Sequence, residues 1–200
     1  MRCIEPGAPA QPTGAGDASD WVKRWTHLAR PGGKVLDVAC GRGRHMAWFA
    51  ALGFHTTGID RASDALQMAS QHGDCIQADI ENTPWPLMHL GRPLQFDVVV
   101  VTNYLWRALL PVVQQSLAPE GLLLYETFAV GNETVGKPSR ADFLLQPGEL
   151  LLACQNLHVI AYENGFLSPP DRFVQRIAAC APPRGTPANP MPLRHPLSLK

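Results

Sequence analysis

Short apolar runs alternate with amphipathic stretches along the middle of the chain. Runs rich in β-branched residues predict buried strands, whereas apolar residues spaced three or four positions apart predict helices. Strands are expected at residues 35–39, 55–60, 75–78, 96–102, 122–128, 157–162 and 173–180. Helices are expected from Asp17 or Ser19 to about Arg30, and at residues 42–52, 63–71, 104–117 (with a restart at Pro111) and 147–155.

Alternation of strands and helices with short connections predicts an α/β fold, in which helices cover both faces of a mostly parallel sheet. The last two strands lack an intervening helix, so we expect them to form an antiparallel hairpin at one edge. Ligands of such sheets bind at the carboxyl ends of the strands. Those ends are expected at Asp37–Gly43, Asp60, Asp79, Thr102–Tyr104 and Glu126–Phe128.

Proline and glycine mark the ends of the predicted domain. Residues 1–17 contain little apolar surface to bury, and we expect a flexible leader there. Residues 181–200 carry prolines too densely for a helix or strand, which predicts a disordered or draped tail. The folded domain is therefore expected to span residues 18–180.

Charge and cysteine usage exclude several classes of protein. Seventeen basic and seventeen acidic residues balance, so no overall charge favours nucleic acid or acidic lipid. The five cysteines are scattered without a C-x-x-C pair, which argues against a disulfide framework or a metal site and favours a reducing compartment. No apolar run approaches the length of a membrane span, and we expect a soluble, cytoplasmic protein.

The most informative motif runs from Val35 to His45, where an apolar strand carrying Asp37 leads into Gly41-Arg42-Gly43 and a helix. Glycines allow a ligand to approach the backbone, and the helix offers free N–H groups. The dinucleotide fingerprint requires a small residue three places after the second glycine, but Met46 stands there. A carboxylate within the strand would repel a pyrophosphate and suits a cation such as the amino group and sulfonium of S-adenosylmethionine. Alternatively, Asp37 bonds the following turn.

Acidic residues also end the next two predicted strands. Asp60 can accept hydrogen bonds from both hydroxyls of an adenosine ribose, or it can cap the following helix. Asp79 can accept from the amine of adenine while the backbone N–H of Ile80 bonds a ring nitrogen, or it can lie in a solvated turn.

Asp37 to His45, Asp60, Asp79 and the strand starting Phe96-Asp97 together resemble the class I S-adenosylmethionine-dependent methyltransferases, over about residues 20–180. The resemblance implies a Rossmann-like, seven-stranded sheet whose last strand is antiparallel. It implies that S-adenosylmethionine is the cofactor, bound by Asp37, Asp60, Asp79 and the loop glycines. Small bacterial enzymes of the tellurite-resistance and thiopurine type are the most similar subgroup. The full set of cofactor-binding residues expected is Asp37, Ala39, Gly41, Gly43, Asp60, Arg61, Asp79, Ile80, Thr102 and Asn103.

The acceptor side of the site is less well defined by sequence. Many enzymes that methylate the amines of bases carry Asn/Asp-Pro-Pro-Tyr after the fourth strand, but this chain has Asn103-Tyr104 without the prolines. Candidate catalytic residues are Tyr104, Glu126 and His45, with Tyr125 facing away from Glu126 by strand alternation. Residues 129–146 form a long loop that predicts a lid, in which Lys137 and Arg140 either bind an anion or are solvated. Arg107 is interpreted as a solvated helix charge rather than an anion clamp.

These residues predict a methyltransferase that acts on a small-molecule acceptor by in-line displacement, as a monomer or homodimer. The alternatives are a nicotinamide-dependent oxidoreductase, against which Met46 and Asp37 argue, and a non-catalytic cofactor-binding subunit that partners another protein.

Overall fold

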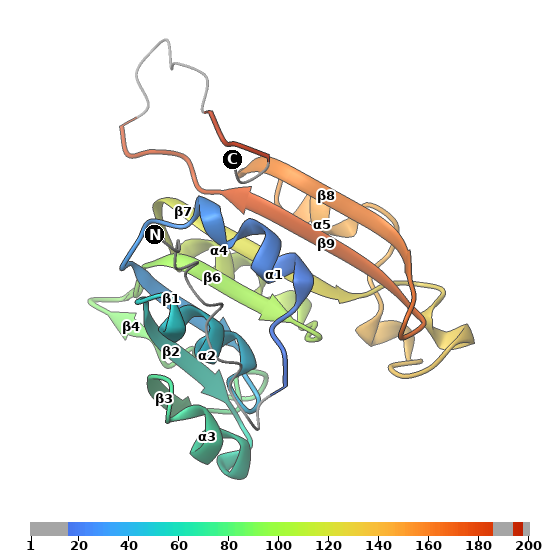
Figure 1. Cartoon of the computed structure of the whole chain (residues 1–200), viewed down its shortest axis with the longest axis horizontal. Helices are drawn as coiled ribbons and strands as arrows, with labels where there is room; N and C mark the ends of the chain where they lie inside the picture. Colours follow the sequence, from blue (N-terminus) through green and yellow to red (C-terminus); the bar gives the residue numbers. More distant parts are fainter. Residues whose placement is uncertain (1–15, 186–193, 198–200) are drawn as a thin grey trace, which may run out of the picture.

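The computed structural model describes residues 16–185 and 194–197, which form one sheet with helices on both faces (Figure 1). The seven strands lie in the order β3-β2-β1-β6-β7-β9-β8. β9 runs antiparallel to both its neighbours, and the other pairings are parallel. The predicted α/β sheet and its C-terminal hairpin are therefore confirmed. The strand bounds are β1 Lys34–Val38, β2 His55–Asp60, β3 Asp74–Gln77, β6 Phe96–Thr102, β7 Leu117–Phe128, β8 His158–Leu167 and β9 Arg172–Cys180.

Two apolar clusters fill the space between the sheet and its helices. One face of the sheet packs against α1 (Asp20–Trp25) and α2 (Arg44–Ala51), with α3 (Ser63–Ala69) beside α2. The opposite face packs against α4 (Leu110–Gln115) and α5 (Glu149–Ala153). The remaining helical turns are η1 Thr26–Leu28, η2 Arg107–Leu109, η3 Asn132–Thr134 and η4 Ala141–Phe143.

The central strand β6 explains why both clusters form. Val98 and Val100 lie in the cluster under α1, whereas Val99 and Val101 lie in the cluster under α4 and α5. All four valines are at most 1% exposed. A run of β-branched residues without polar alternation is typical of a parallel strand buried on both sides.

The predicted helix at residues 104–117 is wrong in its bounds. Asn103 has a positive φ of 54°, and its N–H donates to the carbonyl of Glu126, so the chain first crosses the end of β7. Helical structure begins only at Arg107, α4 has Pro111 in its first turn, and Leu117 already belongs to β7. Leu105 packs against the sheet from the segment before the helix, whereas Leu109 and Leu110 do so from η2 and α4.

A small hairpin of β4 (Met88–His89) and β5 (Arg92–Pro93) was not predicted. Its turn residues Leu90 and Gly91 both have positive φ. Asn or Asp at the first of these two positions is the usual sequence signal, and leucine does not provide it.

Predicted helix ends extend too far in several places. α2 begins at Arg44 rather than residue 42, because Gly41 and Gly43 adopt left-handed conformations that interrupt the helical backbone. The first helix ends in a 3-10 turn at Leu28, and α5 is shorter than residues 147–155. Residues 1–15 of the predicted leader lie outside the described part of the chain, while residues 181–185 and 194–197 of the tail contain no helix or strand. None of the helices in the described ranges is long and apolar enough to cross a bilayer.

Candidate functional site

A cavity of about 400 Å³ lies across the carboxyl ends of the parallel strands. It reaches from the ends of β2 and β3, past β1 and β6, to the end of β7 and the loop that follows. Neighbouring strands are about 4.8 Å apart, so from β3 to β7 the four steps span about 19 Å, enough for two small molecules end to end. The lining residues are Ala39, Asp60, Arg61, Ala78, Asp79, Ile80, Glu81, Asn103, Tyr104, Leu105, Thr127, Phe128, Pro138 and Phe143.

The glycine loop is fastened to the end of β2 by Asp60. Its Oδ2 accepts the N–H of Gly41 at 2.8 Å, and its Oδ1 accepts the N–H of Ala62 at 2.9 Å. Each of these oxygens can accept one further hydrogen bond. Asp60 therefore lines the cavity and bonds the turn before α3, but it is not the N-cap of that helix, which is Ala62.

The two loop glycines serve different purposes. Gly41 has a φ of 53°, and a Cβ there would meet nothing within 4 Å, so its backbone is open to an approaching group. At Gly43, with a φ of 77°, a Cβ would lie 2.8 Å from the Cβ of Ala69. Gly43 is therefore required by the packing of α2 on α3, as well as by its backbone conformation.

Asp37 is buried beneath this loop, with 1% of its surface exposed. Its Oδ2 has no hydrogen-bond partner among the described residues, and its nearest cationic candidate is the Nδ1 of His45 at 3.7 Å. A buried carboxylate oxygen without a donor is costly, which makes a cationic or donor ligand at this position favourable.

Asp79 lies after β3, at the end of the cavity farthest from β7. Its Oδ2 accepts from the side-chain amide of Asn82 at 2.8 Å, and its Oδ1 accepts the N–H of Glu81 at 3.2 Å. The hydrogen bond from Asn82, followed by the backbone bonds, lowers the pKa of Asp79. This carboxylate therefore stays ionised and available as an acceptor.

Tyr104 lines the part of the cavity that follows β6, and its buried hydroxyl has no hydrogen-bond partner among the described residues. Burial, and then the charge of Glu81, raise the pKa of Tyr104. The phenol therefore stays protonated near neutral pH.

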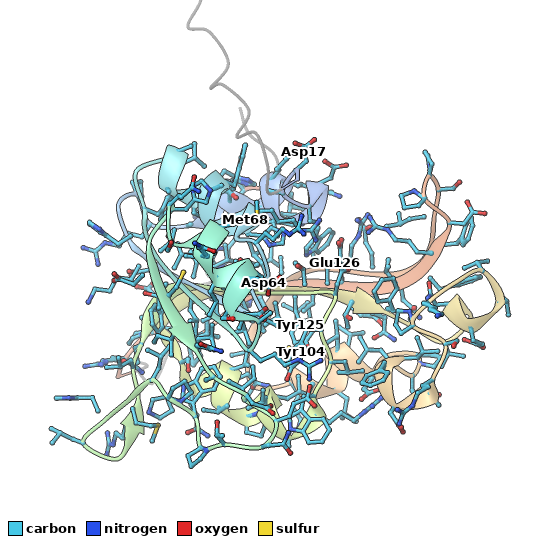
Figure 2. All side chains as sticks on the ribbon, turned by 90° about the horizontal axis from the view of Figure 1, so that it is seen from below. Asp17, Asp64, Met68, Tyr104, Tyr125 and Glu126 are labelled. Atoms are coloured by element: carbon cyan, nitrogen blue, oxygen red, sulfur yellow. The ribbon has the colours of Figure 1, made fainter. Side chains whose placement is uncertain are left out.

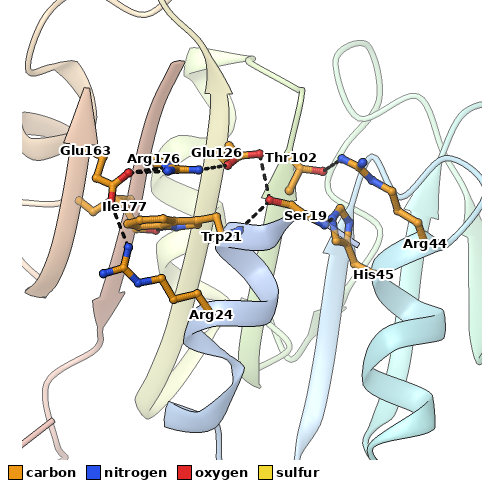
Figure 3. Close-up of polar contacts among 10 residues, drawn as sticks. All are labelled: Ser19, Trp21, Arg24, Arg44, His45, Thr102, Glu126, Glu163, Arg176 and Ile177. Carbon is orange, nitrogen blue, oxygen red and sulfur yellow. Dashed lines mark hydrogen bonds and ion pairs between the residues drawn. The ribbon is translucent and has the colours of Figure 1, made fainter. Parts of the chain in front are cut away.

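Glu126 and His45 do not line the cavity. Figure 2 shows Glu126 on the side of the sheet opposite to Tyr104 and Tyr125. The Oε1 of Glu126 accepts from the hydroxyl of Ser19 at 3.0 Å, and the Ser19 N–H donates to the Nε2 of His45 at 3.3 Å. Both residues are at most 2% exposed. They belong to a buried polar network at the start of α1 (Figure 3).

Arg176 extends this network, and Arg44 makes a separate contact. Arg176 donates to the Oε2 of Glu126 at 3.3 Å and to Glu163 at 2.7 Å, which links β9 to β7 and β8. Arg44 contacts the hydroxyl of Thr102 at 3.4 Å (Figure 3).

Four of the predicted cofactor-binding residues are not among the residues that line the cavity and lie beside it: Asp37, Gly41, Gly43 and Thr102.

Ser19 is the N-cap of α1, since its side chain accepts the N–H of Trp21 at 3.1 Å. A Ser19→Ala variant is expected to lose about 1 kcal/mol of unfolding free energy, because it removes this cap and one donor to Glu126. Urea unfolding measures the loss. Ser70→Ala, at the exposed end of α3, is the control, and an equal loss in both variants would contradict the role given to Ser19.

Sequence reasoning missed the polar contacts that hold the loop between β7 and α5. Arg107 forms a two-pronged ion pair with Glu149, at 2.6 and 3.0 Å, although its side chain is still 42% exposed. The two residues are 42 positions apart, so no local pattern joins them. Glu81 and Leu105 also line the cavity without having been predicted there, whereas Thr127 belongs to a predicted strand end and Pro138 and Phe143 to the predicted loop.

Comparison with known proteins agrees with this geometry. Residues 35–121 match the family model described as "Methyltransferase domain". Over 87 residues the chain is 33% identical to a ubiquinone biosynthesis O-methyltransferase of Paraburkholderia phytofirmans, which covers 42% of this chain and 37% of the relative. Over 125 residues it is 31% identical to the putative methyltransferase YqeM of Bacillus subtilis, covering 53% and 47%. The chain thus spans less than half the length of these two relatives.

Among solved structures, TehB from Haemophilus influenzae is similar with a TM-score of 0.64 at 18% identity, covering 81% of this chain and 61% of TehB. The resemblance predicted from the strand-end residues is confirmed by the family match and by the fold. The motif, the sheet order and the family match over residues 35–121 therefore agree with one another, and the fold is similar to that of TehB.

Proposed function

We propose that this chain transfers a methyl group from S-adenosylmethionine to a small-molecule acceptor. One observation carries the proposal: Ala39, Asp60 and Asp79, from three successive strand ends, line the same cavity as the residues that follow β6 and β7. Cofactor and acceptor can therefore lie next to each other in one cavity. The oxidoreductase alternative gains no support, since Met46 is fully buried where a dinucleotide site needs a small residue.

The residues present fit this cofactor, which when bound supplies an electrophilic methyl group. Asp60 would accept the ribose hydroxyls, and Asp79 with the N–H of Ile80 would hold the adenine. The donor-free Oδ2 of Asp37 suits the cationic amino end, with the backbone of Ala39 beside it. Arg61 and Asn103 complete the wall of the cofactor half.

The chain contributes to the reaction mainly by orienting the two molecules and excluding water. Orientation alone can supply about 7–11 kcal/mol of the barrier in favourable cases. Near the acceptor end, the lining residues in the described part of the chain include no histidine and no carboxylate, and Tyr104 keeps its proton. We therefore propose an acceptor atom that reacts without a strong protein base.

Calorimetric titration with S-adenosylhomocysteine, the demethylated product, tests the proposal. We expect binding with a Kd of about 1–100 µM, equivalent to roughly 5.5–8 kcal/mol. Absence of heat with folded protein would contradict it, and enhanced fluorescence of reduced nicotinamide cofactor would favour the oxidoreductase. Methyl-labelled cofactor, offered with a panel of acceptors, then separates an enzyme from a non-catalytic subunit.

We further propose that the protein acts in the cytoplasm on a small molecule rather than on nucleic acid, as a monomer or homodimer. The balance of basic and acidic residues and the isolated cysteines support this setting. Sedimentation at several protein concentrations distinguishes the two oligomeric states.

A further inference from the structure

The charged residues that line the cavity are gathered at one end. Asp60, Arg61, Asp79 and Glu81 all follow β2 and β3, at the cofactor end. The opposite end, after β6 and β7, is lined by uncharged residues, most of them aromatic or aliphatic: Tyr104, Leu105, Thr127, Phe128, Pro138 and Phe143. An acceptor bound there would meet ring faces and aliphatic groups rather than a counter-charge.

Two of these residues, Pro138 and Phe143, come from the loop between β7 and α5, which is held in place by buried polar contacts. Asn132 is 1% exposed, and its side-chain amide donates to the carbonyl of Pro138 at 3.0 Å. Its Oδ1 accepts the N–H of Phe173 on β9 at 3.2 Å. This end of the loop is therefore fixed to the sheet.

Arg107 holds the segment around Phe143. Its guanidinium donates to the carbonyls of Asp142 and Leu144, at 2.7 and 3.0 Å, on both sides of Phe143. The same guanidinium pairs with both carboxylate oxygens of Glu149, and the N–H of Gln146 donates to that carboxylate at 2.8 Å. Burial alone would raise the pKa of Glu149, but the bonds from Arg107 and Gln146 lower it on balance. The ion pair between Arg107 and Glu149 therefore remains charged near neutral pH.

The cations near this end are not directed into the cavity. Arg140 pairs with Asp142 at 2.8 Å, and its guanidinium lies 5.2 Å from the ring centre of Phe143. Lys137 is exposed and does not line the cavity, although it precedes Pro138. A small oxyanion would therefore lose its hydration without gaining a charged partner.

We infer that the acceptor end of the cavity is a subsite for uncharged aromatic ring compounds, in which Arg107 is the positioning residue that holds Phe143 against the ring. The inference rests on the proposed methyltransferase function and names the substrate class of that same site. Flat rings gain from apolar burial and from edge or stacked contacts with Phe128, Tyr104 and Phe143.

Two fluorescent probes test whether the subsite binds an uncharged ring more tightly than an anionic one. They are 2-naphthol and 2-naphthalenesulfonate, which has the same ring with an anionic group. Both are titrated into the full chain saturated with S-adenosylhomocysteine. We expect 2-naphthol to bind about tenfold or more tightly than the sulfonate, since burial of an unpaired anion is unfavourable. Equal or tighter binding of the sulfonate would overturn the inference.

Variants test the role of Arg107. Phe143→Ala and Arg107→Ala are each expected to weaken 2-naphthol binding about five- to tenfold, and Arg107→Lys less, because a single ammonium replaces only part of the fork. In all three, the affinity for S-adenosylhomocysteine is expected to change less than about twofold, because the cofactor half is untouched. Lys137→Ala, an exposed cation on the same loop, is the matched control and should leave 2-naphthol binding unchanged.

The outcomes separate the two proposals. Failure of the wild-type chain to bind S-adenosylhomocysteine contradicts the proposed function. Normal binding of that product with no 2-naphthol binding, or with 2-naphthol binding unaffected by Phe143→Ala, overturns the aromatic subsite alone. If Arg107→Ala does not fold, Phe143→Ala still tests the aromatic subsite, and Arg107→Lys still tests the positioning role of Arg107. A loss of 2-naphthol binding in Lys137→Ala equal to that in Phe143→Ala would also contradict the positioning role.

Discussion

An Asp60→Ala variant is expected to bind S-adenosylhomocysteine about 10- to 100-fold more weakly than the wild-type chain, a loss of about 1.4–2.7 kcal/mol. The change removes the carboxylate that faces the cavity at the end of β2. It also removes the acceptor for the N–H groups of Gly41 and Ala62, so the glycine loop loses its attachment to β2. Calorimetric titration measures the affinity.

Two further variants separate these contributions. Asp64→Ala removes an exposed carboxylate of α3 outside the cavity and should bind as the wild type does. Asp60→Asn keeps one acceptor oxygen for the loop, and its affinity should lie between those of the wild type and Asp60→Ala. An Asp60→Ala variant with unchanged affinity would remove Asp60 from the cofactor site.

Arg176→Ala is expected to lower the free energy of unfolding by about 3–5 kcal/mol, because it leaves a buried carboxylate without its cationic partner. Glu126 is 1% exposed, and Arg176 is the guanidinium that pairs with it among the described residues. Arg176 also packs its guanidinium 4.8 Å from the ring centre of Trp21. Urea unfolding at neutral pH measures the change.

Arg24→Ala is the matched control for Arg176→Ala, since Arg24 pairs with the same Glu163 but is about half exposed. Its loss should stay within about 1 kcal/mol, as for most surface ion pairs. The double variant Glu126→Gln, Arg176→Met removes both charges and should be more stable than Arg176→Ala alone. Equal losses in Arg24→Ala and Arg176→Ala would show that burial of Glu126 is not the cause.

The sheet could be predicted from sequence because its strands have a strong local signal. The four consecutive valines of β6 strongly favour a strand that is buried on both faces. Asp60 and Asp79 stand at or just after strand ends, where ligands of parallel sheets bind. The lack of a helix between residues 162 and 173 was enough to predict the hairpin of β8 and β9.

Of the catalytic candidates, Tyr104 lines the cavity, but Glu126 could not be placed from sequence, since strand alternation separates it from Tyr125 without saying which of them faces the cavity. In the structure neither lines it, because Glu126 lies under α1 and Tyr125 lies in the opposite apolar cluster. The contacts of Arg107 with Glu149 and of Arg176 with Glu126 join residues 42 and 50 positions apart. Pairings over such distances depend on the tertiary fold, which a single sequence pattern does not encode.

The position of β9 between β7 and β8 has a consequence during synthesis. One side of β7 pairs with β6. The other side pairs with β9, residues 172–180, which are synthesised about fifty positions later. Until those residues leave the ribosome, the nascent chain presents the unpaired backbone of a long apolar strand to any other chain nearby. Chaperone capture of this domain should therefore be greatest in that interval and end when β9 docks.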